Sequence, residues 1–288
     1  MIKLLKGDFV RLFKSRIFWV CVIFMFGFAS MAVYTKWSDS RRFPDYYIPP
    51  DSILLAGAIY ISIVIAVFIG IFIGTDYSSG TIRNKHIMGH SRVNMYLSNL
   101  IICTAASLIM HIIYVTVIVV ASGLGITREF EMSAGNLAAQ VLISIFSVTA
   151  IAAILLFVSM VISSRSAGVV SAIILSLIMI FAAGRIDSWL REEEYITDYN
   201  ISVTDDGGLS YEPIGTEKNP RYMTGANRKA LEFANDVLPV NQVSQLMFGK
   251  PGAAPYDDFS ARFPLYSLSL VVLITTAGTL IFRKKDLK

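Results

Sequence analysis

The feature that most constrains this chain is a set of six long apolar runs. They lie at about 17–35, 52–74, 96–121, 136–162, 168–184 and 263–282. Each reaches or approaches the roughly 20 residues that a helix needs to cross about 30 Å of hydrocarbon. The runs are continuous rather than alternating, which favours helices over the strands of a barrel. The sequence therefore predicts an all-α polytopic membrane protein with six transmembrane helices.

The composition of the 288 residues supports this class. Hydrophobic residues make up 55% and charged residues 16%, and the mean hydropathy is +0.60. An average soluble domain has about 25% charged residues. Inside the six runs ionisable residues are almost absent, with His111 near the middle of the third run as the exception. Secondary transporters usually carry buried ionisable relays, so we expect any active transport here to draw its energy from another polypeptide.

Three residues inside the runs allow two readings each. His111 could take part in a transport pathway, or it could hydrogen-bond a neighbouring helix and do no more. Gly70 and Gly74 form a G-x-x-x-G pair in the second run. Such a pair usually permits close helix packing, and the alternative is that it lines a pore.

The first sixteen residues predict an amphipathic helix. On a helical wheel five apolar residues share one arc, with Lys3, Arg11 and Lys14 opposite; the five are Ile2, Leu5, Phe9, Leu12 and Phe13. A helix of this kind, with cationic flanks, is suited to the inner leaflet interface. The alternative is a disordered basic tail. We do not interpret this segment as a cleavable signal, because no small-residue cleavage site follows the first apolar run.

The basic residues predict the orientation. With the N-terminus inside, the cytoplasmic segments hold thirteen Lys and Arg residues, whereas the two short outer loops hold only Lys36, Arg41, Arg42 and Arg128. An excess of Lys and Arg marks the cytoplasmic side. Six spans then place both termini in the cytoplasm of a bacterial cell membrane.

Residues 185–262 predict a small extracellular subdomain. They begin acidic, continue with turn-rich sequence at 204–208, and regain helical periodicity at about 225–237 and 240–248, with Pro239 ending the first of these helices. We expect these two helices to rest on the outer membrane surface. The predicted organisation is 1–16 interfacial helix, 17–184 five spans with a cytoplasmic loop at 75–95, 185–262 subdomain, and 263–288 sixth span with a basic tail.

Several kinds of chemistry lack a motif in this sequence. There is no G-x-x-x-x-G-K-[ST] phosphate loop, no H-E-x-x-H and no G-x-S-x-G. His86 and His90 are four residues apart, but Gly89 lies between them and no further ligand is near, so we expect no metal site. We therefore expect no catalytic residues and no cofactor in this chain.

One polar loop carries a family resemblance. Residues 76–84 read DYSSGTIRN and are followed by G-H-S-R at 89–92 and by Tyr96. This pattern resembles the E-Y-x-x-G-T-I-R-N and G-x-S-R loop of ABC-2-type permeases, the membrane subunits of bacterial ABC exporters, although Asp76 stands where the family usually has Glu. Leu238-Pro239 with Gln242 is similar to the L-P-x-x-Q element that often precedes the last span of that family.

The resemblance implies a mechanism. Two permease copies would pair, and each would bind a separate subunit that holds ATP and magnesium and hydrolyses the ATP. The loop would contain a short coupling helix whose residues contact this partner: Asp76, Tyr77, Ser78, Ser79, Gly80, Thr81, Ile82, Arg83 and Asn84. Ile82 would be the apolar anchor of the contact. No nucleic acid is implied.

The cargo is the least determined part. Spans poor in charge suit an amphipathic or hydrophobic cargo such as a peptide toxin, an antimicrobial peptide or a lipid-like compound. The alternative is a non-transporting membrane sensor or scaffold, in which the outer segment binds a ligand.

Overall fold

The computed structural model describes residues 1–43, 50–162, 164–203, 208–249 and 261–285. Its elements in chain order are α1 (Ile2–Lys14), α2 (Arg16–Arg42), α3 (Asp51–Leu54), α4 (Ala56–Ser78), α5 (Thr81–Ile87), α6 (Arg92–Gly123), α7 (Ala134–Val161), α8 (Arg165–Arg191), β1 (Tyr195–Val203), β2 (Leu209–Lys218), α9 (Gly225–Val237), α10 (Pro239–Phe248) and α11 (Phe263–Lys284).

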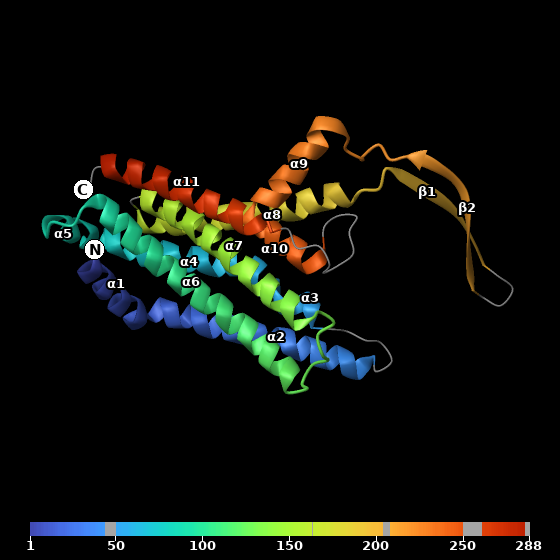
Figure 1. Ribbon diagram of the computed structural model, residues 1–288, viewed down its shortest axis with the longest axis horizontal. Coiled ribbons are helices and arrows are strands. Elements are labelled where there is room, and N and C mark those ends of the chain that lie inside the picture. The colour runs from blue at the N-terminus through green and yellow to red at the C-terminus, as the bar shows by residue number, and fades with distance from the viewer. Residues whose placement is uncertain (44–49, 163, 204–207, 250–260, 286–288) are drawn as a thin grey trace.

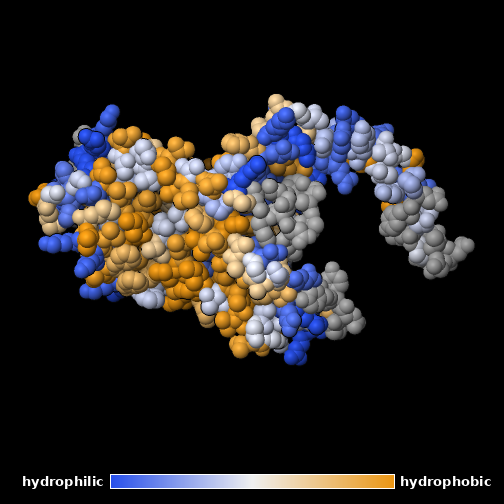
Figure 2. Space-filling model, in the orientation of Figure 1, coloured by the Kyte–Doolittle hydropathy of each residue, from blue (hydrophilic) through white to orange (hydrophobic). Residues whose placement is uncertain are grey.

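The six predicted spans are confirmed as α2, α3–α4, α6, α7, α8 and α11, each long and apolar enough to cross a membrane. They run side by side (Figure 1). Apolar side chains cover the flank of the bundle and hydrophilic ones gather towards its two ends (Figure 2). This distribution matches a bundle whose flank meets hydrocarbon and whose ends meet water. The protein is an all-α polytopic membrane protein apart from one small hairpin.

The core lies around α4, α6 and α7. About half or more of the most apolar window of each is buried, whereas α2, α8 and α11 are mostly exposed. The peripheral helices are therefore the ones that meet lipid or another chain. Both termini and α5 lie at one end of the bundle, here called the terminus end, and the opposite end, here called the hairpin end, carries α9, α10 and the strands (Figure 1).

The glycine pair of α4 serves helix packing. A Cβ atom on Gly70 would lie 2.7 Å from the Cα of Val169, and one on Gly74 would lie 3.0 Å from the Cα of Arg165. Because these neighbours are backbone atoms of α8, a larger residue would push the two helices apart. The structure thus supports the packing role of this pair rather than a pore-lining one.

The hairpin end departs from the sequence-based expectation in two ways. The turn-rich acidic segment forms an antiparallel pair, β1 with β2, with a bulge at Asp198 and Tyr199, and this hairpin projects from the bundle (Figure 1). The helices α9 and α10 were predicted correctly, and Pro239 opens α10. However, α10 does not lie on the outside of the protein: Val240, Val243 and Leu246 are buried, and the helix packs against α7 and α8.

Candidate functional site

The polar loop between the second and third spans is mostly helical. Helix α4 continues through Ser78, and after a short turn the chain forms α5 and then α6. Gly80 has φ +69° and Gly89 has φ +86°, a backbone region that L-residues rarely adopt. Ser91 caps α6 by accepting a hydrogen bond from the Asn94 N–H. The two glycines therefore allow the reversals that place α5 across the terminus end of the bundle.

Helix α5 is joined to the bundle by a buried charge cluster of Asp8 and Arg11 from α1, Asp76 from α4 and Lys85 from α5. Lys85 Nζ donates to Asp8 Oδ1 at 2.7 Å and lies 3.8 Å from Asp76 Oδ2. Arg11 Nη1 donates to Asp76 Oδ1. Ser98 of α6 donates to the other oxygen of Asp8 at 2.7 Å. Four helices, α1, α4, α5 and α6, thus meet at one point.

Burial makes this charge cluster sensitive to the loss of any one member. Asp8 is 3% exposed, Asp76 2% and Lys85 8%. Loss of hydration lowers the pKa of Lys85, and the positive charge of Arg11 adds to this, whereas the hydrogen bond from Lys85 to Asp8 opposes it. Burial likewise lowers the pKa of Arg11, against the attraction of Asp8. Two carboxylates and two cations balance in charge, and removing any one leaves an uncompensated buried charge.

The structure divides the nine loop residues that were predicted to contact a partner. Asp76 and Ile82 are buried within the chain, and Tyr77 donates from its hydroxyl to the Met160 carbonyl at 2.6 Å. Gly80 and Thr81 are half-buried, whereas Ser78, Ser79, Arg83 and Asn84 are exposed. The exposed residues form the surface that a partner can reach.

Two further exposed residues lie at the end of α5. Ile87 is 75% exposed and Met88 is 69% exposed. Ile82, the expected apolar anchor, is 3% exposed and packs inside the chain. The sequence analysis did not single out Ile87 and Met88, although two adjacent apolar residues in a polar loop were a signal of an exposed apolar patch. Exposed apolar side chains beside polar ones are typical of the centre of a protein interface.

The rest of the loop motif caps helix ends. Arg92 donates from Nη1 to the carbonyls of Arg283, at 2.9 Å, and of Lys285, at the end of α11. Lys285 Nζ in turn donates to the carbonyls of Met160 and Val161, both at 2.8 Å, where α7 ends. Unpaired carbonyls at a helix C-terminus attract cations. The arginine of G-x-S-R thus fixes α6 to α11.

The interfacial helix also contacts the protein more than expected. Of the five apolar residues, Leu12 is buried, Leu5 and Phe9 are half-buried, and Ile2 and Phe13 are exposed. The inward face instead carries Leu4, Asp8 and Leu12. Arg11, expected on the polar side of the wheel, pairs with Asp76. Helix α1 is therefore part of the site.

His111 joins two helices. Its Nε2 lies 2.8 Å from the Ser144 hydroxyl oxygen, which links α6 to α7 inside the bundle. In the described part of the chain, its Nδ1 has no hydrogen-bond partner. Of the two roles that the sequence allowed for His111, this contact supports the hydrogen bond to a neighbouring helix.

At the hairpin end, Gln242 of the L-P-x-x-Q element is a buried junction. Its Oε1 accepts hydrogen bonds from Ser147 of α7 at 2.8 Å and from Ser267 of α11 at 2.7 Å. Its Nε2 donates to the Asp236 carbonyl of α9 at 2.9 Å. One side chain therefore ties α10 to three other helices.

We expect Gln242→Leu to lower the free energy of unfolding by about 2–4 kcal/mol, because it removes the hydrogen bonds that Gln242 makes to two buried hydroxyls and a carbonyl. Gln245→Leu is the matched control. Among the residues that the structure describes, its side chain makes one hydrogen bond, to the Asn235 carbonyl at 2.7 Å, so its loss is expected at about 1–2 kcal/mol. Unfolding in detergent measures both, and an equal loss would contradict the junction role.

Residues 4–183 match the model of a family described as ABC-2 family transporter protein. The match covers α1 to α7 and most of α8, and so includes the charge cluster and α5. The hairpin, α9, α10 and α11 lie beyond it. No curated protein matches this sequence.

Proposed function

The chain belongs to the ABC-2 transporter family, and from this membership we propose that it exports an amphipathic or hydrophobic cargo, driven through α5 by its ATP-binding partner. As a permease of an ABC transporter, it spans the membrane and works with a separate ATP-binding subunit. ATP and magnesium are proposed to bind that subunit and not this chain. The direction, the cargo and the route of coupling are the parts that we propose.

The observation that carries the coupling proposal is the position of α5. Its exposed residues Arg83, Asn84, Ile87 and Met88 offer polar and apolar contacts together. Its buried residue Lys85 ties the same helix to α1 and α4. A movement of the exposed face of α5 is therefore transmitted to α1 and α4 through close, charge-assisted contacts and not only through the flexible connection between the helices.

The proposal includes the orientation of the chain in the membrane and its assembly into a pair. Outside the long segment 185–262, which counts little in this rule, the terminus end holds thirteen Lys and Arg residues and the opposite end four, which supports a cytoplasmic position for α5 and both termini. We propose that two copies pair, as the resemblance to ABC-2-type permeases implies, and that the mostly exposed helices α2, α8 and α11 are available for this contact. Peptides are our first choice of cargo, since the spans are apolar and almost free of ionisable side chains.

We expect Arg83→Glu to abolish co-purification of the ATP-binding subunit while the protein stays inserted. Arg83 is exposed and outside the charge cluster, so reversal of its charge changes the contact surface and not the fold. Lys14→Glu, at the exposed end of α1, is the control and is expected to leave the yield unchanged. Normal recovery of the subunit with Arg83→Glu would refute coupling through this surface.

The cargo is tested with the reconstituted complex. Amphipathic peptides are expected to stimulate its ATPase activity and to accumulate on the side opposite the ATP-binding subunit. The Arg83→Glu complex should show neither effect. Stimulation without vectorial movement of the peptide would contradict export and favour a sensor.

A further inference from the structure

A cavity of about 810 Å³ lies at the hairpin end, between the end of α8 and the connection from β2 to α9. Its walls include Arg185, Trp189 and Glu192 of α8 and Arg221, Tyr222 and Asn227 from the connection and α9. Its size is within the roughly 300–1,000 Å³ of ligand sites. None of these residues belongs to the charge cluster or the Gln242 junction.

The arginines around this cavity fall into two kinds. Arg191 pairs with Asp187 at 2.7 Å, and Arg228 pairs with Glu232 at 3.2 Å. Within the described ranges of the chain, neither Arg185 nor Arg221 has a carboxylate partner. Both line the cavity, so two guanidinium groups remain available to an anion there.

The other polar groups of the wall leave the cavity net cationic. Glu192 also lines it, but its Oε2 already accepts a hydrogen bond from Asn219 Nδ2 at 2.9 Å. The Arg185 guanidinium lies over the Trp189 ring, 4.8 Å from its centroid. A guanidinium group can bind two phosphate oxygens at once, so a phosphate group is a suitable anion for this cavity.

The position of the cavity along the membrane normal indicates which molecule would supply such a phosphate. Helix α8 begins at Arg165, and at 1.5 Å per residue it reaches Arg185 about 30 Å further on, which is the thickness of the hydrocarbon core. Trp189 is one turn beyond Arg185, and tryptophan is enriched at the headgroup level. The cavity therefore opens in the headgroup layer and not in bulk water.

An apolar stripe leads along α8 to Arg185. Ile174 is 51% exposed, Ile178 57% and Phe181 76%. Their spacing places them on the same face of the helix as Arg185. The opposite face, with Ala172, Ser176, Ala183 and Ile186, is buried in the bundle. The stripe offers a surface along which acyl chains can lie.

We propose that this cavity binds the phosphate of a phospholipid headgroup, with Arg185 and Arg221 as its ligands and the acyl chains along the α8 stripe. The site belongs to the leaflet at the hairpin end. The proposal depends on the membrane-spanning fold and not on transport, so it can be tested without the ATP-binding subunit.

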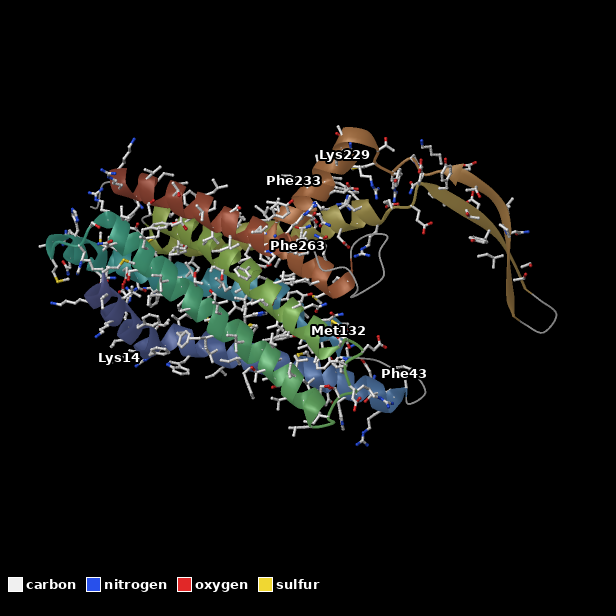
Figure 3. All side chains as sticks on the ribbon, in the orientation of Figure 1. Lys14, Phe43, Met132, Lys229, Phe233 and Phe263 are labelled. Atoms are coloured by element: carbon white, nitrogen blue, oxygen red, sulfur yellow. The ribbon has the colours of Figure 1, made fainter. Side chains whose placement is uncertain are left out.

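The full-length chain is purified in detergent and titrated with short-chain phosphatidylglycerol, and bound lipid is counted by native mass spectrometry. Arg185→Gln and Arg221→Gln are each expected to weaken lipid binding about tenfold, which corresponds to one charge-assisted hydrogen-bonded contact. Glu192→Gln should strengthen binding, because it removes a negative charge from the wall but keeps an oxygen that can accept from Asn219. Lys229→Gln, on α9 but not lining the cavity (Figure 3), is the matched control and should change nothing.

Inorganic phosphate and glycerophosphate separate the two sources of the anion. Neither is expected to displace the lipid at equal concentration, because both lack acyl chains. Displacement by either would overturn the lipid assignment. Equal lipid binding by wild type and the two arginine variants would overturn the site itself, provided that their helical content is unchanged. The opposite shift expected for Glu192→Gln guards against misreading a general loss of folding.

Discussion

Asp76→Ala is expected to lower the free energy of unfolding by about 3–5 kcal/mol, the usual cost of breaking a buried ion pair from one side. The substitution removes the partner of Arg11 and leaves the partly buried Arg11 and the buried Lys85 facing one carboxylate, that of Asp8. Repulsion and lost hydration then act together. Chemical unfolding in detergent, followed by circular dichroism, measures the change.

A surface pair provides the control for this prediction. Asp187 pairs with Arg191 on α8 at 2.7 Å, but both side chains are partly exposed. Asp187→Ala should therefore cost at most about 1 kcal/mol. The double variant Arg11→Met with Asp76→Leu should recover most of the loss, because it removes both charges at once. Similar losses for Asp76→Ala and Asp187→Ala would show that the cluster does not fix α1 and α4.

Gly80→Pro is expected to abolish binding of the ATP-binding subunit while the six spans remain inserted. Gly80 has φ +69°, whereas proline is confined to about −65°. Its N–H also donates to the Tyr77 carbonyl at 3.2 Å, and proline has no N–H to replace it. The turn must therefore change, and α5 loses its position. Co-purification measures binding, and protease accessibility checks insertion.

A graded series at the same position separates backbone geometry from side-chain size. A Cβ atom on Gly80 would meet nothing within 4 Å, so any loss arises from conformation. Asn tolerates the left-handed region and should keep most of the binding, whereas Ala should lose more, at a cost of about 1 kcal/mol. Full binding by Gly80→Pro would contradict a role for this turn.

The sequence predicted the parts of the fold that hydropathy determines. Six spans follow from the length of apolar runs, and Pro239 separates two helices because its ring cannot continue the first. The ends were less predictable: α2 extends to Arg42, beyond the expected 35, and α4 extends through Ser78. Polar residues at the end of a span do not stop a helix. Hydropathy therefore predicts where the chain leaves the membrane, but not where the helix ends.

The charge cluster could not be predicted because its members are far apart in sequence. Arg11 and Asp76 are separated by 65 positions, and no local pattern pairs them. A helical wheel considers one helix by itself, so it placed Arg11 on the polar face and could not show a partner on another helix. One signal was present: Asp8 is spaced by four from both Leu4 and Leu12, so an acidic residue interrupts an apolar face.

The hairpin and α10 were missed for different reasons. Residues 195–203 are rich in β-branched and aromatic residues and lead to Asp-Asp-Gly-Gly, a hairpin signal that the acidic charge obscured. The buried position of α10 includes hydrogen bonds between Gln242 and the serines Ser147 and Ser267 on two other helices. No local sequence pattern indicates such contacts. The partner surface at residues 76–84 stays a prediction, and burial decides which of these residues a partner could reach.

The charge cluster also dictates an order of events during biosynthesis. Arg11 leaves the ribosome 65 residues before Asp76, a delay of roughly 3 to 13 s at usual elongation rates. During that interval α1 has no ionic partner from α4, and Arg11 has only Asp8 of its own helix as an ionic partner among the members of the cluster. Helix α1 therefore cannot form its ion pairs with α4 and α5 until the second span has been made, although it is the first helix to be synthesised.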